Sequence, residues 1–330
     1  MKISILFILL IFSSHVLSSD CIRIRTAFDI GSGTTKMKVG KVDICKQKLI
    51  SLLYENSLPV SFKQSLQNST NNTIDSDTFN SGFLALKILK NESLRFRPTE
   101  FYAVATSAFR TATNLKPFKR KVLSKLNIDI KIISQVQEAK LGFFSATSLT
   151  SKSMQKVIVW DIGGGSMQMT AWNGKEFEIY EGKHAAVTFK DFVIESIQRK
   201  NRLTFKSPNP MKLAESDLAI LKASEFAKLE VSKLIKDKIN AGAEILGIGG
   251  LHYYSIKGQS SNSNIYTIDQ VLNALKKNTG LTDKELNANY SETQVTNLAL
   301  VSGFMKALNI KSVVTGKVNL ADGLLINPEI

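Results

Sequence analysis

The chain has 330 residues, with 43 lysines and arginines against 28 aspartates and glutamates, a formal net charge of +15. This excess favours polyanionic partners such as polyphosphate, nucleotides, nucleic acid or anionic membrane surfaces, but it does not indicate a fold. The length is sufficient for two domains of ordinary size, and the presence of only 3 histidines argues against a histidine-based metal site.

The first predicted element is a secretory signal peptide at residues 1–18. Lys2 precedes an uncharged apolar run over residues 3–12, and Val16 and Ser18 suit a cleavage site after Ser18. The run is shorter than the ~20 apolar residues that span a bilayer. We therefore expect an exported protein, periplasmic or extracellular, without a membrane span. An uncleaved N-terminal anchor is the alternative.

The second predicted element is a β-hairpin whose turn carries a glycine loop. Its strands are expected at residues 22–29 and 35–44, and Gly33 in the turn lies midway between Cys21 and Cys45. The two cysteines should therefore face each other at the open end of the hairpin, where they can form a disulfide in an oxidising compartment. Two unpaired thiols are the alternative.

Helices and strands alternate along the rest of the chain. A polar stretch at residues 64–80 is predicted to be a loop. Helices are expected over residues 81–90, 118–126, 137–148, 212–241 and 293–308. Strands are expected over residues 101–106, 128–134, 157–161, 167–172, 176–180, 245–248 and 312–315. This alternation indicates an α/β fold with layered sheets.

The most informative segment is residues 157–166, in which an apolar strand runs into Asp161, three glycines and Ser166. The segment around Asp29 repeats this arrangement. Glycine runs let backbone N–H groups approach an anion, and the acid at the strand end can hold a hydrated divalent cation. One copy alone is better explained as a tight turn. Two copies predict a duplicated fold with two phosphate loops that face one cleft.

Five motifs together resemble the exopolyphosphatase/guanosine pentaphosphate phosphatase family. They are the loops that begin at Asp29 and Asp161, the Ala-Thr-Ser-Ala-Phe-Arg segment at residues 105–110, Ile-Ser before Glu138, and Gly-Ile-Gly-Gly at residues 247–250. Their order and spacing match the short form of the family over essentially the whole chain after residue 18. The resemblance implies the actin, sugar-kinase and heat-shock ATPase superfold.

In this superfold two ribonuclease-H-like domains, each a mixed sheet with flanking helices, enclose a central cleft. The resemblance implies a first domain at residues 19–135, joined by the C-terminal tail at residues 316–330. The second domain is then expected at residues 136–315.

The resemblance also implies hydrolysis of a terminal phosphoanhydride bond, with Glu138 as the general base on water. Asp29 and Asp161 would hold Mg²⁺ or another divalent cation that neutralises charge on the transferred phosphoryl group. The residues expected to bind phosphate are Ser32, Gly33, Thr34, Arg110, Gly164, Gly165, Ser166, Gly249 and Gly250. From the residues alone, Glu138 is better explained as an acid favoured by the helix dipole at an N-terminus. The alternative for Arg110 is a surface arginine that caps a helix or strand end.

Some positions depart from the pattern of this family. Gln168 stands where a second acid is usual, and the acids that usually precede Glu138 are missing. Leu251 replaces a threonine, and Asp322 lies in Ala-Asp-Gly where Arg-Glu-Gly is expected. An amide cannot act as a base or bind a cation as a carboxylate does. A glutamine here is, however, similar to the apyrase-type nucleoside triphosphate diphosphohydrolases, so Gln168 stays a catalytic candidate that orients the attacking water.

Three functions therefore stay open. The first is an exported hydrolase of polyphosphate or guanosine pentaphosphate. The second is an apyrase-like nucleoside tri- or diphosphatase, and the third is a polyanion-binding protein with a weakened hydrolytic site. We expect a polyphosphate or nucleotide substrate and no specific nucleic acid partner. The oligomeric state is left open, with a homodimer as one option.

Overall fold

The computed structural model describes residues 21–328 of the protein. The predicted signal peptide at residues 1–18 lies outside the described residues. Within the described part of the chain, no helix is both long enough and apolar enough to cross a membrane.

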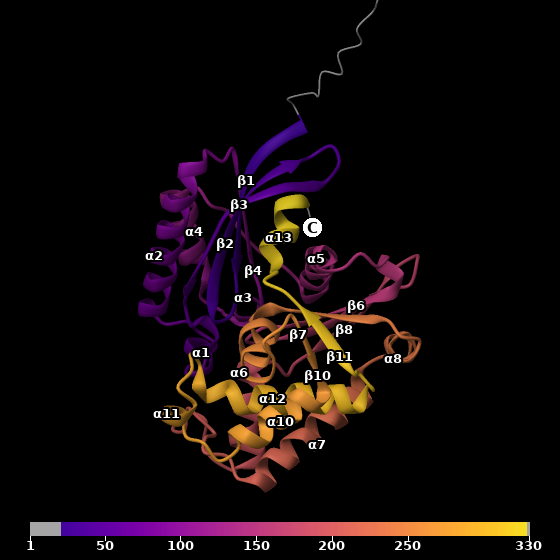
Figure 1. Ribbon diagram of the computed structural model, residues 1–330. Helices are drawn as coiled ribbons and strands as arrows, with labels where there is room; N and C mark the ends of the chain where they lie inside the picture. The colour runs from indigo at the N-terminus through magenta and orange to yellow at the C-terminus, as the bar shows by residue number, and fades with distance from the viewer. Residues whose placement is uncertain (1–20, 329–330) are drawn as a thin grey trace, which may run out of the picture.

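Two mixed β-sheets form the framework of the molecule (Figure 1). The first has the order β3-β2-β1-β4-β5, with β1 (Ile22–Ile30), β2 (Thr34–Asp43), β3 (Lys48–Pro59), β4 (Glu100–Ala105) and β5 (Ile130–Ile132). The second has the order β10-β11-β9-β6-β7-β8, with β6 (Val157–Ile162), β7 (Met167–Trp172), β8 (Phe177–Gly182), β9 (Glu244–Ile248), β10 (Ile265–Thr267) and β11 (Ser312–Thr315).

The two sheets repeat one local topology. The central strand β1 is antiparallel to β2 and parallel to β4, and β6 is likewise antiparallel to β7 and parallel to β9. Every residue of β6 is buried, as expected for a strand that is covered on both faces. This repetition confirms the predicted fold class of two mixed sheets with flanking helices.

Helices cover both sheets. They are α1 (Phe62–Gln67), α2 (Ser76–Ser93), α3 (Ser107–Thr111), α4 (Leu115–Leu126), α5 (Gln135–Ala146), α6 (Ala186–Phe192), α7 (Leu213–Glu230), α8 (Lys233–Asn240), α9 (Lys257–Ser260), α10 (Ile268–Asn278), α11 (Asp283–Leu286), α12 (Ser291–Ala307) and α13 (Leu320–Ile326). Short 3₁₀ turns occur at η2 (Leu94–Phe96), η3 (Thr147–Leu149) and η4 (Met154–Lys156), and π-helical turns at η5 (Val193–Ile197) and η6 (Leu251–Ile256).

Side chains alternate between the two faces of each central strand and join different cores. On β1, Phe28 packs in the core formed with α2 and α4, whereas Ala27 packs with Leu141 of α5 and Leu324 of α13. On β6, Trp160 packs in the core with α7 and α12, whereas Val159 packs with α5. Helix α5 therefore contacts one face of each sheet, and it lies between them in Figure 1.

Helix α12 is buried on nearly all sides because it lies between α7 and the second sheet. Its Gly303 permits the close approach of α7, since a Cβ there would lie 2.4 Å from the Cβ of Ala223. In Figure 1, α7, α10 and α12 lie side by side on the outer side of the second sheet.

The C-terminal helix α13 returns to the first sheet and α5 (Figure 1). Lys38 of β2 is buried and its Nζ donates to Oδ1 of Asp322 over 2.7 Å. The acid that departs from the Arg-Glu-Gly pattern is thus the partner of a lysine buried in the first sheet. The exact boundary residues between the two predicted domains stay a prediction.

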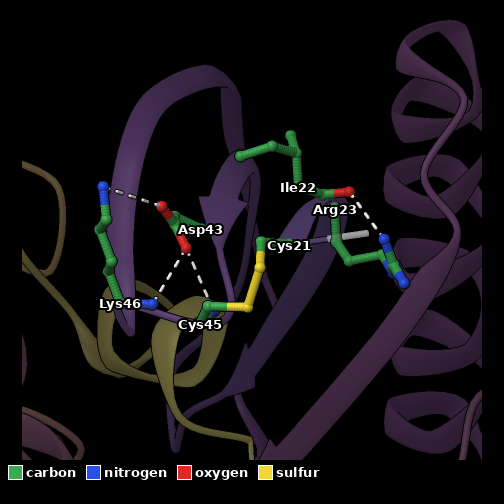
Figure 2. Close-up of a disulfide and its surroundings, with 6 residues drawn as sticks. All are labelled: Cys21, Ile22, Arg23, Asp43, Cys45 and Lys46. Atoms are coloured by element: carbon green, nitrogen blue, oxygen red, sulfur yellow. Dashed lines mark hydrogen bonds and ion pairs between the residues drawn. A yellow bond between two sulfur atoms is a disulfide. The ribbon is translucent and has the colours of Figure 1, made fainter. Parts of the chain in front are cut away.

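The predicted disulfide between Cys21 and Cys45 is present, with 5.4 Å between the two Cα atoms (Figure 2). Ile22 and Asp43 are paired at this end of the β1–β2 hairpin. Two other local predictions are wrong in part. The predicted loop at residues 64–80 is confined to residues 68–75, because most of α1 and the start of α2 lie in that range. The polar side chains obscured the Phe62 and Leu66 spacing that buries α1.

The stretch at residues 212–241, predicted as one helical unit, is two helices. Val231 adopts an extended backbone and ends α7. Ser232 then caps α8 by accepting a hydrogen bond from the Ile235 N–H. A serine at an N-cap satisfies a free helical N–H, and this residue type is therefore favoured where a new helix begins.

Candidate active site between the two glycine loops

The two glycine loops have the same backbone turn. Gly31 N donates to Thr34 O over 3.0 Å after β1, and Gly163 N donates to Ser166 O over 3.0 Å after β6. The equivalent bonds at equivalent strand ends show that the loops are structural counterparts, as the repeated sequence pattern predicted.

The loops face each other at very close range. A Cβ built on Gly164 would lie 3.0 Å from the Cβ of Ser32. A Cβ on Gly165 would lie 2.7 Å from Ser107 Oγ and 3.2 Å from Ser32 Oγ. A side chain at Gly165 would displace Ser107 Oγ and one at Gly164 would press on Ser32, so the two glycines let the second loop approach the first.

The acids that end the two central strands both face α5. Asp29 is two residues beyond Ala27, and Asp161 is two residues beyond Val159, so each shares the strand face that packs on α5. Helix α5 carries Glu138 in its first turn. The topology therefore brings together the three carboxylates that the sequence analysis selected.

Glu138 is held at the start of α5 by a well-defined cap. Ser134 accepts from the Gln137 N–H, and the Gln137 side chain accepts from the Ser134 N–H. Glu138 itself is buried. Burial raises its pKa to about 7, although the nearby Arg110 lowers it.

Arg110 joins the two halves of the site. Its Nη1 donates to Glu138 Oε2 over 2.7 Å and to Ile133 O over 3.1 Å, while Nη2 donates to Ser166 Oγ over 3.2 Å. An arginine has five N–H donors, so Nε and one N–H of Nη2 are left for a ligand. The residue predicted to bind phosphate therefore also contacts the predicted base.

Asp29 and Asp161 differ in their partners. Lys36 of β2 lies opposite Asp29 in the sheet register, and its Nζ donates to Asp29 Oδ2 over 2.8 Å. Among residues 21–328, Asp161 has neither a hydrogen bond nor an ion pair, although it is only 8% exposed. Burial raises the pKa of Asp161 to about 6; Lys36 lowers it, and Asp29 raises it.

The Gly-Ile-Gly-Gly segment at residues 247–250, at the end of β9, packs against Asp161. Gly249 has a φ of +86°, and a Cβ there would lie 2.6 Å from Asp161 Oδ1 and 2.7 Å from Ile162 O. Both the left-handed backbone and the contact require glycine. Gly250 begins the π-helical turn η6. These glycines position Asp161, and whether they also bind phosphate stays a prediction.

Gln168 lies directly across from Asp161 in the register of β6 and β7. It is 1% exposed, and its Nε2 donates to Ser166 Oγ over 3.4 Å. Its Oε1 has no hydrogen-bond partner in the described part of the chain. Gln168 thus lies beside both the acid and the serine of the second loop.

The arrangement of these carboxylates suits a cation that keeps its water ligands better than one coordinated only by protein side chains. In the described residues, the one group of three or more acidic, histidine or cysteine side chains whose ligand atoms all lie within 4.8 Å is Cys21, Asp43 and Cys45. Its two sulfurs are bonded to each other. A cation near Asp161 would therefore keep several water ligands, as Mg²⁺ usually does.

Three residues at this site were not selected from the sequence: Lys36, Lys63 and Ser107. Lys36 could have been noticed as a lysine beside the first loop on a strand expected to be buried. Lys63 lies directly before the predicted loop at residues 64–80, outside every predicted element, yet its Cε would lie 3.2 Å from a Cβ on Gly165. Ser107 lies in the 105–110 motif, where no pattern distinguished it from its neighbours.

These features define an actin-like fold of two mixed-sheet halves with paired loops. The model of the Ppx/GppA phosphatase family matches residues 42–192. The resemblance to this family that the motifs predicted is thereby confirmed, as is the class of enzyme, a phosphoanhydride hydrolase.

Solved structures support the same fold over nearly the whole chain. An exopolyphosphatase from Cytophaga hutchinsonii has a TM-score of 0.71 at 17% identity and covers 92% of this chain and 96% of its own. The Aquifex aeolicus Ppx/GppA family member has a TM-score of 0.68 at 17% identity and covers 93% and 97%. A nucleoside triphosphate hydrolase from Neospora caninum has a TM-score of 0.54 at 11% identity and covers 93% and 92%.

Proposed function

We propose that the protein hydrolyses terminal phosphoanhydride bonds of polyphosphate or guanosine pentaphosphate, with Glu138 as the general base. One observation carries the proposal: a buried carboxyl with a pKa of about 7 lies beside Arg110 and the second glycine loop. A base is most effective when its pKa is close to the working pH. Near neutral pH, part of the Glu138 population is ionised and can take a proton from water.

The donor set supports a divalent cation at Asp161, with Asp29 as the second acid. Asp161 is a buried carboxylate without a partner in the described part of the chain, and oxygen ligands of this kind suit Mg²⁺. Such an ion would supply positive charge to the phosphoryl group during transfer. Lys36 already neutralises part of the charge of Asp29, so Asp161 is proposed as the main ligand.

The rest of the chemistry is assigned to donors of the chain. Arg110 has free N–H groups that can donate to phosphate oxygens while Nη1 holds the Glu138 carboxylate in place. The backbone at Gly164 and Gly165 has no side chain of its own, so its N–H groups can approach an anion closely. Ser32 and Ser166 add hydroxyl donors on either side of the contact between the loops.

We also propose that the protein works outside the cytoplasm, in the periplasm or the extracellular medium. The signal-peptide pattern at residues 1–18 and the Cys21–Cys45 disulfide support export, because disulfides persist in oxidising compartments. N-terminal sequencing of protein recovered from the exported fraction tests this proposal. A mature N-terminus after Ser18 is expected, and a retained Met1 in a cytoplasmic fraction would contradict it.

The second candidate function is an apyrase-like nucleoside tri- or diphosphatase. The observation that favours it is the buried Gln168, whose amide lies beside Ser166 and whose Oε1 is free to accept a bond from water. In this alternative Gln168 orients the attacking water. The third candidate, a polyanion-binding protein with a weakened site, is favoured by the loss of an acid at this position.

One experiment separates the three functions. Phosphate release is measured from long-chain polyphosphate, guanosine pentaphosphate, ATP and ADP, with Mg²⁺ and with a chelator. Release from the first two substrates, dependent on the metal, is expected. Faster release from ATP and ADP would favour the apyrase-like function. Tight binding of polyphosphate with no release from any substrate would favour the binding protein.

A further inference from the structure

Three donors without partners meet at Gly165. A Cβ on this glycine would lie 2.7 Å from Ser107 Oγ, 3.2 Å from Ser32 Oγ and 3.2 Å from Lys63 Cε. Ser32 is 6% exposed and Ser107 is 8% exposed. In the described part of the chain, neither hydroxyl makes a hydrogen bond, and the Lys63 ammonium makes neither a hydrogen bond nor an ion pair. Two hydroxyls of largely buried serines and one half-buried ammonium group therefore have free donors at one point, and a ligand there could accept from all three.

The surrounding charge indicates that this ligand is an anion. Burial lowers the pKa of Lys63, Asp191 raises it, and Arg110 and Arg202 lower it further. The one acid in this set is already engaged, because Asp191 pairs with Lys190 over 3.3 Å and accepts from Gln67. A partly buried cation among other cations is costly unless a counter-charge is supplied. A phosphate group supplies that charge.

Helix α1, which carries Lys63, is held in place by hydrogen bonds from both halves of the molecule. Lys63 N donates to Ser32 O over 2.9 Å, which ties the start of α1 to the first loop. From the other half, Lys190 Nζ donates to Gln64 Oε1 over 3.2 Å and Arg202 Nη1 donates to Gln67 O over 2.6 Å. The backbone that carries Lys63 is therefore held by both halves of the molecule.

We propose that Lys63 and Ser107, together with Ser32, form a binding subsite for a phosphate group of the substrate, with Lys63 as its charged ligand. The subsite lies where the two glycine loops meet, so it accepts a phosphate of the same chain whose terminal group is attacked beside Glu138. This inference rests on the proposed function for the identity of the substrate. It adds Lys63 and Ser107, which the sequence analysis did not select, to the residues that bind phosphate.

The test measures binding without turnover. Inorganic tripolyphosphate is titrated calorimetrically, at fixed Mg²⁺, into the Glu138→Gln protein and into the same protein carrying Lys63→Met. We expect Lys63→Met to raise the Kd about 10- to 100-fold, the usual effect of losing a hydrogen bond from a charged group. Ser107→Ala should raise it less. Lys63→Arg should keep the Kd within a few-fold of the parent, because the charge is retained.

Lys233→Met is the matched control, since its side chain is 87% exposed on α8. It should leave the Kd unchanged, and thermal unfolding checks that every variant folds. An unchanged Kd in Lys63→Met overturns the proposal; if that variant does not fold, an unchanged Kd in both Lys63→Gln and Ser107→Ala overturns it. A weaker Kd in Lys63→Met, found together with no phosphate release by the unmutated protein, overturns the proposed hydrolysis and keeps the subsite.

Discussion

Arg110 donates to Glu138 over 2.7 Å, so the residue predicted to bind phosphate directly contacts the residue predicted to activate water. The same guanidinium reaches Ser166 in the second loop over 3.2 Å. The base, the phosphate ligand and one glycine loop are therefore one hydrogen-bonded unit. A change at any of the three should alter the others, which leads to the first two predictions.

Glu138→Gln should keep the fold and remove most turnover. An amide is isosteric with the carboxyl group and can still accept from Arg110, but it cannot take a proton from water. General-base catalysis typically contributes ~10²–10⁴-fold in rate, and phosphate release should fall by that range. Glu225→Gln, on the exposed side of α7, is the control and should be fully active. Equal release by both variants would end the assignment of Glu138.

The pH dependence of kcat/KM should report the ionisation of Glu138. The base acts when ionised, so activity should rise with pH through about 7, where burial places its pKa. Arg110 lowers that pKa. Arg110→Gln should therefore move the inflection to higher pH, besides weakening substrate binding. An inflection that stays in place, or moves to lower pH, would show that Glu138 does not set the profile.

Asp161→Asn should raise the Mg²⁺ concentration needed for half activity more than Asp29→Asn does. Asp29 already has a cation beside it, since Lys36 Nζ lies at 2.8 Å, whereas Asp161 has no partner among the described residues. Metal titrations of both variants measure the difference. A larger effect in Asp29→Asn would reverse the proposed ligand order, and unchanged titrations in both would argue against a metal site at these acids.

The sequence predicted the parts of the site that depend on local pattern. Two apolar strands that each end in an acid and a glycine turn gave Asp29, Asp161 and the facing loops. The pairing of Lys36 with Asp29 was missed, because it depends on the register between two strands. The contact of Gly249 with Asp161 was missed for a similar reason, since their strands are distant in sequence and adjacent only in the sheet.

The largest error concerned α1 and what it carries. Its six residues include two glutamines, a serine and a lysine, a composition that is typical of a loop. Its position depends on bonds to Lys190 and Arg202, which come from the other half of the molecule. No local propensity encodes such contacts. Lys63 therefore became visible as a site residue only when both sheets were in place.

Removing the disulfide should cost stability and leave activity intact. Cys21 and Cys45 are 24 residues apart and close the end of the β1–β2 hairpin that is remote from the glycine loop (Figure 2). On the loop-entropy model, a bridge over such a loop contributes about 3 kcal/mol to the free energy of unfolding. Cys21→Ser/Cys45→Ser should lower denaturant stability by about that amount. Unchanged stability, or a loss of activity under conditions where the variant is folded, would contradict this.

The last prediction concerns Gln168, the position where the chain departs most clearly from the family pattern. Glutamate has the same size, so the buried space across from Asp161 can hold it. Without metal the two carboxylates repel each other and should lower the thermal stability. With Mg²⁺ the added charge is an extra ligand for the hydrated ion, whereas the amide offers one neutral oxygen.

We therefore expect Gln168→Glu to reduce the Mg²⁺ concentration needed for half activity on polyphosphate. The variant should also gain more thermal stability from added Mg²⁺ than the parent protein does. Gln168→Ala removes the amide without adding a charge, so it separates the effect of the lost amide from the effect of the gained charge. Lower phosphate release by Gln168→Glu and Gln168→Ala on every substrate would instead show that the amide orients the attacking water, as in the apyrase-like alternative.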